Sequence, residues 1–86
     1  MSTLNVAVVS VGQNIWSGAA KSLVAKTTEG EIGILAGHEP VLSLLVDGVV
    51  RVEGETGEKI EVSITGGFLA VDNNSVRVLA EEAKVL

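Results

Sequence analysis

The sequence predicts an all-β protein built from many short strands. Ten glycines divide the 86 residues into short pieces. The pieces between them are rich in Val, Ile and Leu and have the length of strands. They recur at even spacing, a pattern typical of a β-sandwich or a β-barrel. The expected strands cover residues 4–11, 23–27, 32–35, 41–46, 49–53, 59–64, 68–71 and 76–79.

The first strand, residues 4–11, is apolar on both of its faces. Successive side chains of a strand point to opposite faces, so Leu4, Val6 and Val8 face one way. Ala7, Val9 and Val11 face the other way. Such a strand is either enclosed by its own fold or covered by a partner. In so small a domain, the second explanation carries weight.

Two hairpins follow from the later strands. Apolar and polar residues alternate along 49–53 and 59–64, which predicts one buried and one wet face, and Gly54 and Gly57 suit the turn between them. Residues 68–79 form the second hairpin, with turn residues at 72–74. Residues 80–86 are good helix formers, but the segment is too short for a stable helix of its own.

The composition excludes several classes of function. The chain has no cysteine, so it holds no disulfide and no thiolate metal site. A net charge of −5 argues against a nucleic-acid partner, whose phosphates need clustered Lys and Arg. The apolar fraction is 47% and the mean hydropathy +0.46, yet no apolar run reaches the ~20 residues of a membrane span. The excess of apolar residues therefore lies inside the fold or against another protein.

The segment from Thr28 to Leu45 holds the only histidine and the only proline, but no recognisable catalytic pattern. His38 has no nucleophile motif near it, and the glycines lack the lysine and helix of a phosphate-binding loop. We therefore expect no catalytic residue, no cofactor and no metal ligand. Two alternatives remain open: a small-molecule enzyme or binding barrel that uses Glu29, Glu31 and His38, and a free-standing sandwich that dimerises through an apolar strand face.

Several motifs in order resemble the ε subunit of F-type ATP synthase, in its N-terminal β-sandwich domain. These are "NVAVVS", "WSG", "EGEIGIL-GH-P", "GVVRV", "GGFL-V" and "VRVLA", and they cover essentially the whole chain. The resemblance implies a flattened sandwich of two antiparallel sheets with about ten short strands. It also implies a subunit without an active site of its own.

The partners that the resemblance implies are the γ subunit and the ring of membrane c subunits. The domain would sit in the central stalk and help to couple proton-driven rotation of the ring to ATP synthesis. It would be a peripheral protein on the cytoplasmic face of a bacterial membrane. No nucleotide is expected to bind this domain, and no direct membrane insertion is expected.

Four residues match family positions near these partners. Glu31 matches the position that approaches the polar loops of the c-ring. Gly37 and His38 match the loop at the junction of γ and the ring, and Ser10 matches a position beside γ. Ala36 departs from the family, which usually has proline there.

The resemblance also sets an expectation for domain organisation. The family usually continues into a helical hairpin, and this chain stops at Leu86, close to where that hairpin would begin. We therefore expect residues 1–86 to form a single sandwich domain without the hairpin.

Overall fold

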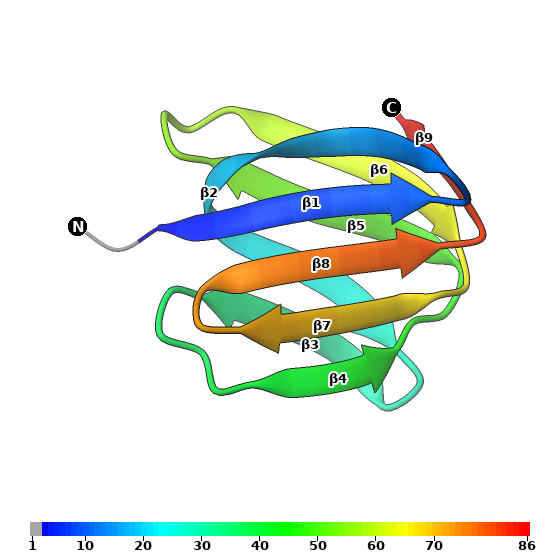
Figure 1. Ribbon diagram of the computed structural model, residues 1–86, viewed down its shortest axis with the longest axis horizontal. Helices are drawn as coiled ribbons and strands as arrows, with labels where there is room; N and C mark the ends of the chain where they lie inside the picture. Colours follow the sequence, from blue (N-terminus) through cyan, green and yellow to red (C-terminus); the bar gives the residue numbers. More distant parts are fainter. Residues whose placement is uncertain (1–2) are drawn as a thin grey trace.

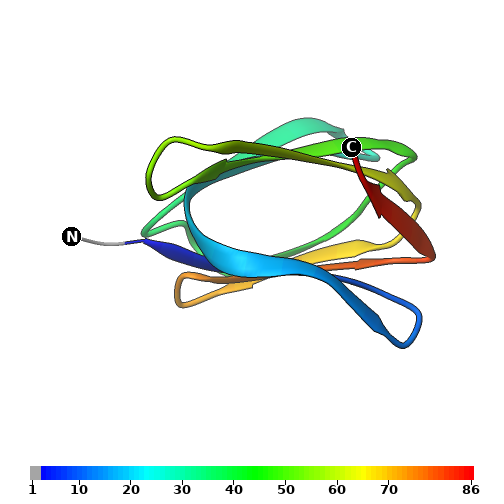
Figure 2. The same ribbon diagram turned by 90° about the horizontal axis from the view of Figure 1, so that it is seen from above.

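The computed structural model describes residues 3–86, which form nine strands in two stacked layers (Figures 1 and 2). The strands are β1 Leu4–Ser10, β2 Gln13–Thr27, β3 Gly30–Leu35, β4 Val41–Leu44, β5 Gly48–Gly54, β6 Lys59–Thr65, β7 Phe68–Asp72, β8 Ser75–Ala80 and β9 Glu82–Val85. The all-β sandwich expected from the sequence is therefore confirmed.

One long strand, β2, joins the two layers. Its first part pairs with β1, and its second part pairs with β5 and β3. The pairing with β5 shifts register between Ala20 and Ser22, where the strand passes from one layer to the other. One layer therefore contains β4, β7, β8 and β1, and the other contains β3, β5, β6 and β9 (Figure 1).

The core lies between the layers and is almost entirely aliphatic. Alternate residues of each strand point inward, and the ten largest of the fully buried side chains are exposed by less than 2%. These residues are Leu4, Val8, Leu23, Ile34, Val50, Val52, Val62, Leu69, Val76 and Val78. Burial of such side chains contributes roughly 1.5–3 kcal/mol each, so the aliphatic alternation read from the sequence carries the fold.

Within residues 3–86, the structure differs from the sequence expectations in four details. There are nine strands where about ten were expected, and β1 and β8 run parallel, so the pairing is not purely antiparallel. Strand β2 begins at Gln13, far earlier than the predicted residue 23, because residues 13–20 pair with β1 although only Ile15 and Trp16 among them are large and apolar. The last residues form β9 against β6 in place of the helix that their propensity allows.

Two turns show why particular residues stand at the ends of β7. Asn73 and Asn74 both have positive φ, at 51° and 66°, in the turn between β7 and β8. Asparagine tolerates this left-handed conformation better than most residues. At the other end of β7, Gly67 has a φ of 121°, and a Cβ there would lie 1.9 Å from the carbonyl oxygen of Leu79. Only glycine fits that position.

Candidate partner-binding surfaces

One layer of the sandwich carries apolar side chains on its outer side as well as in the core. Leu44 pairs with Phe68, Phe68 with Leu79, and Leu79 with Val9. Residues paired across neighbouring strands share a face, so these four side chains form a row across β4, β7, β8 and β1. We define the apolar face as this row together with Leu42 and Val11.

The apolar face is well exposed. Accessibility is 72% for Leu42, 54% for Leu44, 47% for Phe68 and 43% for Leu79, while Val11, directly after β1, reaches 84%. A shallow groove follows the row toward one end of the sandwich, with Thr28 and Glu81 on its polar border. Water-exposed apolar area costs about 25 cal/mol per Å², and a continuous patch of it marks an interaction site.

The outer side of the other layer is charged. Arg51 on β5 and Glu61 on β6 lie opposite each other, and their Nε and Oε2 atoms are 3.1 Å apart. Glu53 and Lys59 form the neighbouring cross-strand pair. We call these four residues the charged face. Here the polar–apolar alternation of the sequence places charge in water and valine in the core.

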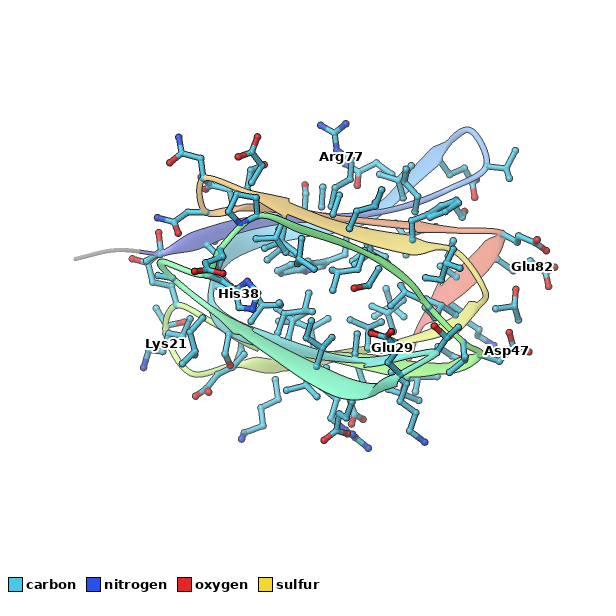
Figure 3. The ribbon with its side chains drawn as sticks, turned by 90° about the horizontal axis from the view of Figure 1, so that it is seen from below. Lys21, Glu29, His38, Asp47, Arg77 and Glu82 are labelled. Atoms are coloured by element: carbon cyan, nitrogen blue, oxygen red, sulfur yellow. The ribbon has the colours of Figure 1, made fainter. Side chains whose placement is uncertain are left out.

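One end of the sandwich is acidic. Figure 3 shows Glu29, Asp47 and Glu82 toward the same end, and Glu81 precedes Glu82 in the turn between β8 and β9. The backbone N–H of Glu29 donates to Thr27 Oγ1 at 3.1 Å, and that of Gly66 donates to Asp47 Oδ1 at 2.9 Å. These bonds fix the turns. Glu31, one residue inside β3, is exposed beside this acidic end.

The loop between β3 and β4 lies at the opposite end. Gly37 has a φ of 88°, and its N–H donates to Asn74 Oδ1 at 2.7 Å. His38 Nδ1 donates to the carbonyl oxygen of Glu39 at 2.7 Å, and the ring is half-buried. The loop is therefore held to the β7–β8 turn by a hydrogen bond to the Asn74 side chain, and His38 is turned onto its own loop.

The four residues predicted to contact partners fall at two separate ends. Ser10 and Glu31 lie at the acidic end, and Gly37 and His38 lie at the other, along a longest dimension of 32 Å (Figure 1). Only 9% of Ser10 is exposed, so its neighbour Val11 offers far more surface to a partner. The roles of all four residues stay predictions.

The structure excludes the alternative of a small-molecule site formed by Glu29, Glu31 and His38. Glu29 and His38 lie toward opposite ends of the sandwich (Figure 3), so these side chains do not converge. Within residues 3–86, no group of three or more His, Asp or Glu side chains is placed to hold a metal ion. The same residues include no helix long and apolar enough to cross a membrane.

The carboxyl group of Glu58 has a lowered pKa. In the β5–β6 turn, the Thr56 hydroxyl and backbone N–H both donate to the Glu58 carboxylate. These hydrogen bonds stabilise the charged form and lower the pKa of Glu58. The effect belongs to a solvent-exposed turn and marks no catalytic group.

Most of the apolar face was missed by reasoning from the sequence. The signal was present, because "VLSLLV" and "FLAV" are apolar at both odd and even positions, as the first strand is. Short runs of this kind also fit a strand enclosed within its own fold. Only the pairing of β4 and β7 at the edge of a layer shows which of their apolar residues face water.

Comparison with known proteins identifies the family of this chain. The model of the ATP synthase delta/epsilon chain β-sandwich domain matches residues 3–85. The chain belongs to the ATP synthase delta/epsilon chain family. It is thus a subunit of ATP synthase that is not a catalytic one.

Curated members of the family are close in sequence. An ATP synthase epsilon chain of Mycobacterium tuberculosis (strain ATCC 25177 / H37Ra) is 49% identical over 85 residues, which is 98% of this chain and 70% of the relative. The epsilon chain of Corynebacterium jeikeium is 46% identical, covering 96% of this chain and 68% of the relative. Both matches therefore cover nearly all of this chain.

Two solved structures share the fold. A chain of the Euglena gracilis mitochondrial ATP synthase, in an assembly of OSCP, F1 and c-ring, superposes with a TM-score of 0.93 at 30% identity. That match covers 99% of this chain and 54% of the Euglena chain, so this chain spans about half of it. A chain from the central stalk and c-ring of the Tetrahymena thermophila enzyme has a TM-score of 0.78 at 17% identity, which shows the fold alone.

Proposed function

We propose that this delta/epsilon chain is a central-stalk subunit that binds γ through its apolar face and meets the c-ring through its acidic end. It would thereby help to couple rotation of the ring to ATP synthesis, on the cytoplasmic side of a bacterial membrane. The proposal rests on the apolar face, which no other part of residues 3–86 covers.

The apolar face suits a permanent partner. Long-lived interfaces resemble a domain core cut in half, with aliphatic and aromatic side chains at the centre and polar residues at the rim. Leu44, Phe68 and Leu79 supply that centre, and Thr28 and Glu81 lie at its border. The charged face lacks such a centre, so it is the side we expect to remain in water.

The acidic end suits a different contact. Glu29, Glu31, Asp47 and Glu82 stand on tightly hydrogen-bonded turns or at the start of a strand. Loops of the c-ring that carry polar and basic groups would meet them through complementary charge. Such contacts set the orientation of the bound partner and the association rate more than the affinity.

Binding to γ is tested with the purified chain and its γ subunit. Leu44→Asp places a charge at the β4 end of the row, beside Phe68, and should weaken γ binding by about 30-fold or more, the effect of losing a hot-spot residue. Leu35→Asp is the matched control, since Leu35 is 64% exposed on β3, in the other layer. Isothermal titration would show normal affinity for the control. Equal losses in both variants would contradict the assignment of γ to the apolar face.

The contact with the ring is tested in the assembled enzyme. Glu31→Lys reverses one charge at the acidic end and should reduce ATP-driven proton pumping relative to ATP hydrolysis. The isolated variant should melt like the wild type, because Glu31 is exposed. Unfolding of Glu31→Lys would make the residue structural, and unchanged coupling would remove its proposed role.

A further inference from the structure

We propose that Arg77 fixes the orientation of the partner on the apolar face by pairing with a carboxylate that γ presents there. This inference rests on the proposed function, because it takes γ to be the protein that covers this face. It assigns to one side chain a role that the hydrophobic row cannot fulfil: choosing a single docked geometry.

Arg77 stands in the interior of the layer. It lies on β8, with β7 on one side and β1 on the other, and it points away from the core (Figure 3). Its cross-strand neighbours are Ala70 and Ala7, and the next residue along this line is Leu42. It is one row away from Phe68 and Leu79. A partner that covers the apolar row therefore also reaches Arg77.

The guanidinium is unpaired in the domain itself. Among residues 3–86, the one ion pair joins Arg51 and Glu61 on the opposite layer, and Arg77 makes no side-chain hydrogen bond. Asp72 lines the same shallow hollow as Arg77, together with Ala70 and Ser75, but forms no ion pair with it. Its alanine neighbours are short, so the guanidinium projects beyond them and is free to meet a partner.

Covering an unpaired arginine is costly. A charge that loses its water without gaining a partner strongly destabilises a complex. A carboxylate on γ removes this cost, and the planar guanidinium binds both of its oxygens in a defined plane. Apolar contacts tolerate sliding, whereas this pair does not. The expected complement on γ is thus an Asp or Glu flanked by apolar residues.

The test compares substitutions of Arg77 in the purified complex with γ. Arg77→Glu should raise the dissociation constant by about 30-fold or more, mainly through faster dissociation. Arg77→Met keeps the length of the apolar stem but removes the charge, and it should also weaken binding, by about tenfold or more. Arg77→Lys should recover part of that loss, because it restores charge without the two-pronged geometry.

The matched control is Arg51→Glu, which reverses a charge on the other layer and should leave γ affinity unchanged. Thermal melting of each isolated variant checks that the fold persists. If Leu44→Asp abolishes binding while Arg77→Met and Arg77→Glu bind like the wild type, the Arg77 inference is overturned and the proposed function stands. If Leu44→Asp itself binds normally, the proposed function fails instead.

Discussion

The two outer surfaces of the sandwich follow opposite rules although they enclose the same core. On the layer of β5 and β6, polar residues alternate with buried valines, and Arg51 pairs with Glu61 in water. On the layer of β4, β7 and β8, the outward positions hold Leu44, Phe68 and Leu79. The core alone requires only one apolar side per strand. The second apolar side is therefore evidence of a surface kept for another protein.

Among tests of the difference between the two layers, the largest effect is expected at Gly67, which directly precedes β7 in the layer that bears the apolar face. Gly67→Ala brings a Cβ against the Leu79 carbonyl oxygen and strains a positive φ. We expect a loss of about 3 kcal/mol or more in the free energy of unfolding, measured by urea denaturation. Gly33→Ala on β3 is the control, because a Cβ there meets nothing within 4 Å. Similar stability of the two variants would contradict this reading of the turn.

A smaller effect is expected at the other end of β7. Asn74→Ala removes a residue suited to positive φ and the acceptor of the Gly37 N–H. The combined loss should be about 1–2 kcal/mol, and amide exchange should quicken in the β3–β4 loop. Unchanged exchange at Gly37 would show that the loop is held by other contacts.

On the charged face, the Arg51–Glu61 pair should contribute little. Both side chains are about half exposed, so Glu61→Gln should cost about 0.5 kcal/mol or less, and less still in high salt. Chemical denaturation at two salt concentrations measures this. If Glu61→Gln lowered the free energy of unfolding as much as Asn74→Ala does, the ion pair of the charged face would be a substantial support of the fold, which contradicts this prediction.

The smallest effect concerns the turn that joins the two strands of the charged face. Thr56→Val removes the hydroxyl donor to Glu58, so the pKa of Glu58 should rise toward its ordinary value. Because the pKa of Glu58 is lowered in the folded state, the carboxylate stabilises the fold at neutral pH. This contribution to the free energy of unfolding is lost as the pH falls through the lowered pKa. NMR titration of Glu58 follows this directly, and a pKa unmoved by Thr56→Val would point to another cause.

Much of the fold was predictable because burial enforces alternation. Val50, Val52, Val62 and Ile64 were expected on one face and lie in the core. The long strand β2 was not expected before residue 23, since Ser17, Gly18 and Ala19 carry no strand signal and depend on pairing with β1. Tertiary hydrogen bonding overrode local preference there, as it did at β9.

The candidate surfaces were less predictable than the fold. Motif resemblance pointed to Ser10, Glu31, Gly37 and His38, but it does not convey that these residues fall at two ends of the molecule. Arg77 carries no motif at all. The predicted hairpin of β7 and β8 places it beside Ala70, but its position beside Ala7 depends on the parallel pairing of β1 with β8, which brings together segments that are about 70 residues apart in the chain.

The central claim is that γ covers the apolar face and leaves the opposite layer in water. Methyl NMR of the leucine-labelled chain, recorded with and without γ, tests it most directly. Leu42, Leu44 and Leu79 should show large shifts and intermolecular contacts, while the exposed Leu35 on β3 stays unchanged. Shifts confined to Leu35, with the three leucines of the apolar face unaffected, would contradict the account.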